Sequence, residues 1–74
     1  MEADRFGEKL LRLRRGRDWT LAILASRLGY KSRGHLSEIE SGRKKPSVLL
    51  VVKAARLFGV TTDDLLLDER EVEG

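Results

Sequence analysis

Few side chains in this sequence are of the kinds that catalyse reactions or hold metal ions. There is no cysteine and one histidine, His35, so the common Cys/His ligand sets for zinc cannot be assembled. A nucleophilic triad would need His35 beside a serine, but Ser37 lies two residues further on, and side chains at that spacing do not face each other on a helix. Gly7 and Gly16 do not form a phosphate-binding loop. We therefore expect no enzyme activity, no metal site and no cofactor.

Hydrogen-bonding and cationic side chains gather instead between residues 20 and 46. Within this stretch, the segment from Ser32 to Ser41 has a polar surface except at Leu36 and Ile39. Its Arg33 has the donors to bind guanine O6 and N7, and its Glu38 can accept from cytosine N4. Three cations that suit phosphate groups follow it, Arg43, Lys44 and Lys45. A helix with such a broad polar face is either simply solvated or contacts a ligand.

Charge is distributed unevenly along the 74 residues. Residues 1–60 carry 14 Lys/Arg and 6 Asp/Glu, a net charge of +8, whereas residues 61–74 carry 1 and 6, a net charge of −5. A basic body with an acidic tail favours a polyanionic partner for the body, although a solvated surface has the same composition. No apolar run approaches the roughly 20 residues of a membrane span. Arg12 and Arg14 interrupt the N-terminal leucines, so a secretory signal is not expected.

Apolar periodicity and capping residues predict five helices and no strand, an all-α fold. The first runs from about Asp4 to Arg17, and the second begins after Thr20 and ends at Gly29. The other three begin after serine or threonine caps, Ser32, Ser47 and Thr61, and are expected to extend to about Ser41, Phe58 and Leu67. We expect residues 4–68 to form one domain and residues 69–74 to form a flexible acidic tail.

The second and third helices, joined by a short turn, have the spacing of a helix-turn-helix. In that arrangement the second of the two helices enters the DNA major groove with its N-terminal residues at the base edges. The predicted base-contacting residues are Arg33, Gly34, His35, Ser37 and Glu38. The predicted phosphate-contacting residues are Thr20, Tyr30, Lys31, Arg43, Lys44 and Lys45, with simple packing over the turn as an equal alternative for Tyr30. The missing side chain of Gly34 allows close approach of the backbone to DNA.

These residues resemble the Xre/Cro/C1-like helix-turn-helix family, to which the DNA-binding domains of lambdoid phage repressors belong. The resemblance covers about residues 6 to 67 and implies a five-helix fold of the lambda-repressor type. It rests on a set of positions rather than on any one of them: Leu13-Arg14, Thr20, Leu24-Ala25, Leu28-Gly29, Ser32, Leu36-Ser37, Ile39-Glu40-Ser41-Gly42, Pro46-Ser47, Ala54-Ala55, Leu57, Gly59-Val60, Asp63 and Leu65.

The resemblance implies a structural role for Arg14 and Glu40, which match the family's buried arginine–glutamate pair. A carboxylate beside the apolar side of the third helix needs such a partner, and the alternative is that both are surface charges. The chain departs from the family twice. Leu21 replaces the usual glutamine, which leaves Thr20 or a backbone N–H to bind phosphate. The turn is also one residue longer, within Tyr30-Lys31.

The leading hypothesis is a sequence-specific regulator of transcription that binds double-stranded DNA, a dimeric repressor on a palindromic operator. A single short helix gives little specificity, and two-fold symmetry doubles its contacts. The predicted homodimer surface is apolar: Val60, Leu65, Leu66 and Leu67. With no ligand-binding domain expected, regulation would act through concentration, a partner or proteolysis.

Two other hypotheses share the fold. One is an antitoxin or adaptor whose acidic tail binds a protein partner, either a toxin or the transcription machinery. The other is a restriction–modification controller. For each hypothesis the expected location is the cytoplasm of a bacterium, at the nucleoid, with the protein encoded by the bacterium or a phage and no membrane partner.

Overall fold

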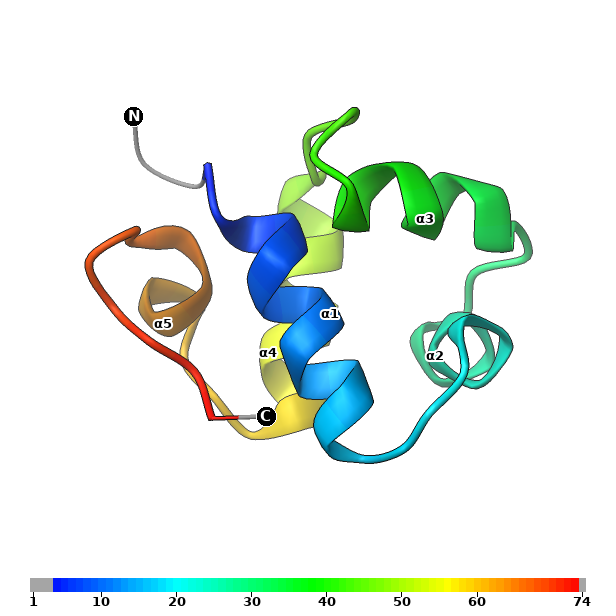
Figure 1. The fold of residues 1–74 in the computed structure, drawn as a ribbon, viewed down its shortest axis with the longest axis horizontal. Helices are drawn as coiled ribbons and strands as arrows, with labels where there is room; N and C mark the ends of the chain where they lie inside the picture. Colours follow the sequence, from blue (N-terminus) through cyan, green and yellow to red (C-terminus); the bar gives the residue numbers. More distant parts are fainter. Residues whose placement is uncertain (1–3, 74) are drawn as a thin grey trace.

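The computed structural model describes residues 4–73, which form five α-helices and no strand. These are α1 (Phe6–Gly16), α2 (Leu21–Leu28), α3 (Arg33–Glu40), α4 (Val48–Phe58) and α5 (Thr62–Leu66) (Figure 1). The all-α prediction is confirmed, and the bounds of α4 agree with those expected. The first helix starts two residues later than predicted because Asp4 and Arg5 form a turn. Within the described residues, no helix is long and apolar enough to cross a membrane.

Four helices begin at the side-chain caps that the sequence predicted. The hydroxyl oxygen of Thr20 accepts from the Ile23 N–H at 3.2 Å, and Ser32 and Ser47 cap α3 and α4 in the same way. Thr61 and Asp64 form a reciprocal capping box at α5. Each cap satisfies a backbone donor that has no partner inside its helix, which determines where the helix starts.

Two glycines end helices in the left-handed conformation. Gly29 follows α2 with φ of 76°, and Gly59 follows α4 with φ of 68°. Side chains with a Cβ atom rarely adopt this conformation, which is why glycine marks both ends. After Gly29 the chain turns directly toward α3, and the Tyr30 N–H donates to the carbonyl of Ala25 at 2.8 Å.

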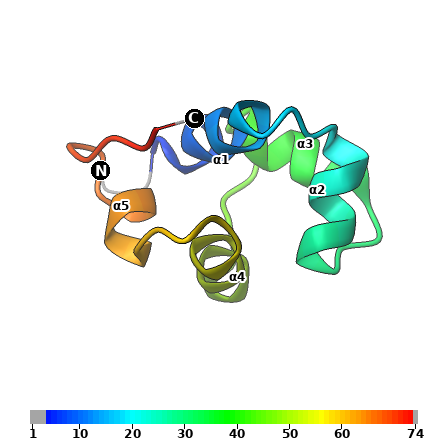
Figure 2. The same ribbon diagram turned by 90° about the horizontal axis from the view of Figure 1, so that it is seen from below.

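The helices enclose one hydrophobic core, and α1 lies on one face of the molecule, between α3 and α5 (Figures 1 and 2). It packs against α3 on one side and α5 on the other, while α2 packs against both α3 and α4 (Figures 1 and 2). Side chains from every helix meet in this core. Those fully enclosed include Phe6, Leu10, Leu24, Leu36, Ile39, Leu50 and Leu65.

The crossing of α1 and α3 depends on a glycine. At Gly7 the backbone of α1 lies directly against the C-terminal end of α3. A Cβ atom at this position would overlap the carbonyl oxygen of Ile39 and approach that of Glu40 to 2.9 Å. The absence of a side chain therefore determines how closely α3 can be held against the core, a role that the sequence analysis did not anticipate.

The crossing of α1 and α5 depends on a buried lysine. The side chain of Lys9 is completely buried, and its ammonium donates to the backbone carbonyls of Asp64 and Leu67, both at 2.7 Å. Buried charges need such partners, and carbonyls at a helix C-terminus carry a partial negative charge. Lys9 therefore fixes the short helix α5 on α1.

The acidic segment after α5 lies along α1. The Arg5 guanidinium donates to a Glu71 carboxylate oxygen at 2.8 Å, and the Arg5 backbone N–H donates to the Asp68 carboxylate at 3.1 Å. Val72 is 5% exposed and belongs to the core. The tail that was expected to be flexible thus makes ionic contacts with the domain through Glu71 and apolar contacts through Val72.

Candidate nucleic-acid interface

The polar face of α3 points outward because the apolar residues of this helix are anchored in the core. Leu36 and Ile39 are fully buried, and the Ser32 hydroxyl caps the helix through the His35 N–H at 3.2 Å. Side chains three and four positions apart share a helix face, so burial of these two residues turns the others away from the core. Arg33, Gly34 and Ser37 are exposed, and His35 and Glu38 are partly exposed.

The predicted pair between Arg14 and Glu40 is present and almost enclosed. Arg14 Nε donates to Glu40 Oε2 at 2.9 Å, and Nη2 donates to Oε1 at 3.1 Å. The two side chains are only 13% and 8% exposed. Arg14 also donates to the Trp19 carbonyl at 2.8 Å. This bidentate ion pair connects α1 to the C-terminal end of α3 and so fixes the orientation of α3.

The basic loop after α3 folds back onto the end of that helix. The Glu38 carbonyl accepts from the backbone N–H groups of Arg43 at 2.9 Å and Lys44 at 3.2 Å, and from the Ser41 hydroxyl at 3.0 Å. These bonds hold the loop beside α3, along the upper edge of the molecule in Figure 1. The Lys44 ammonium lies 3.7 Å from the Glu38 carboxylate, and both side chains are largely exposed. Such an exposed pair contributes little to stability, so breaking it to free the Lys44 ammonium costs little.

Several predicted contact residues carry unpaired positive charge. Arg33, Lys31, Arg43 and Lys45 are exposed, and none has an ionic partner among residues 4–73. Their charges flank α3 at both ends, from the turn before it and the loop after it. Cations without carboxylate partners attract phosphates without first having to break an ion pair.

His35 and Tyr30 pack against each other at the start of α3. Their rings are stacked, with centroids 6.0 Å apart and planes at 5°. The Lys53 ammonium from α4 lies 5.5 Å from the Tyr30 ring centroid. Tyr30 is half-buried and packs on the core. The packing role of Tyr30, one of the two alternatives, is therefore present, while its phosphate contact stays a prediction.

The start of α2 carries one of the predicted phosphate-contacting side chains, Thr20. Thr20 is exposed, and its oxygen already accepts from Ile23 N–H, so its own hydroxyl hydrogen remains available to a phosphate. Leu21, which stands where the family has glutamine, is half-buried and packs on the core. Leu21 therefore contributes packing in place of a polar contact.

One of the four residues predicted to form the dimer surface, Leu65, is not on the surface. Leu65 is 0% exposed and belongs to the core of its own chain, so it has no surface to offer a second copy. The short helix α5 needs this side chain to attach to the domain. Val60, Leu66 and Leu67 are partly exposed and remain available.

Among residues 4–73, three large apolar residues that the sequence analysis did not single out are exposed, and besides Ile23 in α2, at 39%, two of them lie in α4. Val48 is 82% exposed and Leu49 is 58% exposed, at the start of α4 directly after the basic loop. The repeat of Leu50, Ala54 and Phe58 on the buried face would have placed both outside the core. They lie apart from the predicted dimer surface in sequence.

Comparisons with known proteins agree with this geometry. A helix-turn-helix family model (HTH_3) matches residues 10–65. The HTH-type transcriptional activator BcrR of Enterococcus faecalis is 41% identical over 64 residues, which cover 86% of this chain and 31% of that protein. The chain thus spans about a third of the length of this curated relative.

Two solved structures have the same fold. The clp gene regulator ClgR from C. glutamicum is 32% identical with a TM-score of 0.72, over 85% of this chain and 80% of that chain. The restriction-modification controller protein C.AhdI from Aeromonas hydrophila has a TM-score of 0.73 at 24% identity, over 85% and 94% of the two chains. The predicted family is confirmed, and the chain belongs to the helix-turn-helix family, whose members include DNA-binding regulators of transcription.

Proposed function

We propose that this domain binds double-stranded DNA sequence-specifically and regulates transcription, with α3 in the major groove. The observation that carries the proposal is the orientation of α3, whose polar side faces outward while Leu36, Ile39 and the Arg14–Glu40 pair fix its other side. The major groove is about 12 Å wide and admits one helix.

In this proposal the contacts divide by type. Arg33, Ser37 and Glu38 bind base edges, with Gly34 and His35 at the closest approach of α3 to the groove. The flanking groups bind phosphates and set the register of the domain on DNA: Thr20, Tyr30, Lys31, Arg43, Lys44 and Lys45. With few base contacts, part of the selectivity comes from DNA shape.

We further propose that two copies bind a palindromic operator. Two recognition helices separated by about one helical turn read twice as many bases as one. Val60, Leu66 and Leu67 form the proposed contact between the copies, and their partial exposure supports it. Sedimentation of the free protein and of its DNA complex measures the assembly. A monomer in both would exclude this part of the proposal while leaving DNA binding intact.

A domain of this kind can either repress or activate transcription when it is bound to its operator. Occupying an operator that overlaps a promoter represses transcription, which is the outcome we propose first. The 41% identical relative is named as an activator, which supports activation as the second candidate. A reporter gene with the selected operator placed over or upstream of the promoter separates the two outcomes.

The decisive experiment is selection of bound DNA from a random pool at several salt concentrations. We expect enrichment of one motif with two-fold symmetry, and affinity that falls as salt rises because phosphate contacts release counterions. Binding that is steeply salt-dependent but enriches no motif would reduce the interface to a basic surface and contradict the proposal.

A further inference from the structure

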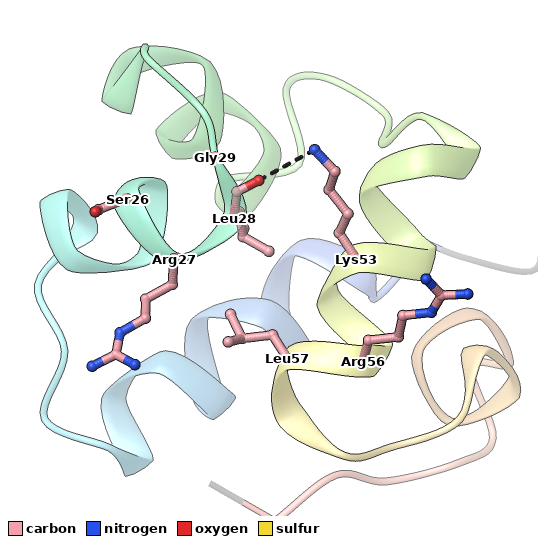
Figure 3. Close-up of a pocket in the computed structure, with 7 residues that line it drawn as sticks. All are labelled: Ser26, Arg27, Leu28, Gly29, Lys53, Arg56 and Leu57. Atoms are coloured by element: carbon pink, nitrogen blue, oxygen red, sulfur yellow. Dashed lines mark hydrogen bonds between the residues drawn. The ribbon is translucent and has the colours of Figure 1, made fainter.

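A shallow groove of about 470 Å³ opens between α2 and α4, away from the residues proposed to contact bases. Its walls are the C-terminal half of α2 with the following glycine and the middle of α4 (Figure 3). Leu28 extends from α2 and Leu57 from α4 into the space between the helices (Figure 3). Leu28 is only 3% exposed, so the partly exposed Leu57 supplies the apolar surface of the floor. Ser26, Arg27, Gly29, Lys53 and Arg56 complete the lining.

The rim of this groove carries three cations and no carboxylate. Arg56 is exposed and has no hydrogen-bond or ionic partner among residues 4–73. Arg27 lies with its guanidinium carbon 4.9 Å from the Trp19 ring centroid, a contact that leaves its N–H donors at the edge of the plane unused. Lys53 donates to the Leu28 carbonyl at 3.4 Å, a long bond.

Three other arginines of this chain are paired, although Arg15, Arg33 and Arg43, like Arg56, have no ionic partner among the described residues. Arg5, Arg14 and Arg70 each have a carboxylate partner within 3.1 Å. The groove thus combines an apolar floor with cations that no acidic side chain of the described residues neutralises, so its charge and shape complement an acidic segment that also carries apolar side chains.

We propose that the groove between α2 and α4 is a docking site for a short acidic peptide segment of a partner protein. Carboxylates of the segment pair with Arg27 and Arg56 on opposite sides of the groove, and an apolar side chain lies on Leu57. The partner is bound beside DNA, because none of the residues assigned to base contacts lines the groove. This gives the regulator a surface for a second protein while α3 occupies DNA.

A peptide suits the groove better than a second stretch of DNA backbone. Phosphates gain nothing from the apolar surface that Leu57 supplies to the floor. An acidic peptide can place its apolar atoms there and keep its carboxylates at the arginines.

The test measures fluorescence anisotropy of a labelled synthetic peptide made of Glu and Leu, titrated with the protein. Two matched peptides replace the Glu residues with Gln, or the Leu residues with Ser. We expect the original peptide to bind, and Arg56→Glu to weaken its binding roughly tenfold or more. Arg56→Gln, which places no negative charge near the C-terminus of α4, should give a smaller loss. Arg15→Glu is the control, because Arg15 is exposed, unpaired in the described residues and outside the groove.

Several outcomes would overturn the proposal. Equal losses for Arg56→Glu and Arg15→Glu, or equal binding of the peptide with Ser in place of Leu, would show general charge attraction. Loss of DNA affinity in Arg56→Glu without loss of peptide affinity would assign the groove to DNA. The peptide titration needs no DNA, so it also decides the proposal if no operator is selected and the proposed function fails.

Discussion

Arg33 lies at the first position of α3, exposed and without a partner among the described residues. On DNA its guanidinium is proposed to bind one guanine through two hydrogen bonds. Substituting Arg33→Ala should therefore remove roughly 1–3 kcal/mol of discrimination at that base pair. Competition between the selected operator and a scrambled sequence measures this loss. Selectivity equal to that of the unchanged protein would contradict the assignment, and Arg15→Ala controls for loss of one positive charge.

Unlike Arg33, Arg14 is proposed to stabilise the fold rather than to contact DNA. Substituting Arg14→Ala leaves Glu40, which is 8% exposed, without its ionic partner. Loss of one member of a buried pair is costly, so we expect the free energy of unfolding to fall by about 3 kcal/mol. The neighbouring exposed residue is the control, and Arg15→Ala should change stability by no more than about 0.5 kcal/mol.

A double substitution separates the energy of the Arg14–Glu40 interaction from that of the other contacts of Arg14. If Arg14 and Glu40 stabilise each other, replacing both by Ala should cost clearly less than the sum of the single losses in urea unfolding. Additive losses would mean that Arg14 acts through its bond to the Trp19 carbonyl rather than through Glu40.

At the scale of elements, two glycines on neighbouring helices predict opposite effects of the same substitution. A Cβ at Gly7 would overlap the backbone of α3, whereas at Gly34 it would meet only the Ser32 hydroxyl at 3.7 Å, an ordinary contact. Gly7→Ala should therefore lower the free energy of unfolding by about 1–3 kcal/mol. Gly34→Ala should raise it by up to about 1 kcal/mol, because alanine favours helix.

The second variant also tests the interface. Gly34→Ala should bind the operator more weakly even though its folded state is more stable, because the added methyl group lies at the proposed closest approach to DNA. Thermal melting and DNA titration of the same two proteins give both quantities. Tighter or unchanged DNA binding in Gly34→Ala would move the closest approach elsewhere on α3.

The elements differ in how well the sequence predicted them. Caps at Thr20, Ser32, Ser47 and Thr61 are local signals, because each side chain bonds to an N–H three residues away, and they gave the starts of four helices. The Arg14–Glu40 pair spans 26 residues. The position of Glu40 beside apolar residues indicated that it needs a partner, but the family resemblance identified that partner as Arg14.

Contacts that depend on the complete fold were not predictable in this way. The Lys9 ammonium meets carbonyls 55 and 58 residues away. The spacing from Phe6 and Leu13 places Lys9 on the apolar face of the first helix, but the local sequence does not show which distant groups its ammonium would meet. The close approach of Gly7 to α3 likewise depends on how two distant helices cross. The assignment of Leu65 to a dimer surface was wrong for the same reason, because its burial depends on where α5 packs.

At the scale of the whole molecule, the segment after α5 determines whether the domain ends at Asp68 or extends further. Val72 is 5% exposed, so replacing it with Ala removes two buried methyl groups and should cost about 1–2 kcal/mol of unfolding free energy. Val48→Ala is the matched control, since Val48 is 82% exposed and its loss should change little. Equal, negligible effects in both variants would mean that residues 69–74 form the flexible tail that the sequence predicted.

The ionic contacts of this segment predict a dependence of stability on pH. The hydrogen bond from Arg5 lowers the pKa of Glu71 to about 2, and the charges of Arg5 and Arg12 act in the same direction. In the unfolded chain the pKa of this glutamate is about 4.3. Between these values the unfolded state binds more protons, so acidification favours unfolding. The stabilisation by Glu71 is therefore complete above about pH 4.3 and is lost as the pH falls toward 2.

Removing this carboxylate should flatten the acid side of the stability profile. Glu71→Gln keeps the shape of the side chain but cannot pair ionically with Arg5, so its free energy of unfolding should fall less steeply than that of the unchanged protein below about pH 4.3. Urea unfolding at low ionic strength, where screening is weak, measures the slopes. Glu73→Gln is the control, because Glu73 is exposed and has no ionic partner among residues 4–73. Parallel profiles for Glu71→Gln and the unchanged protein would show that Arg5 and Glu71 do not hold the segment on α1 in solution.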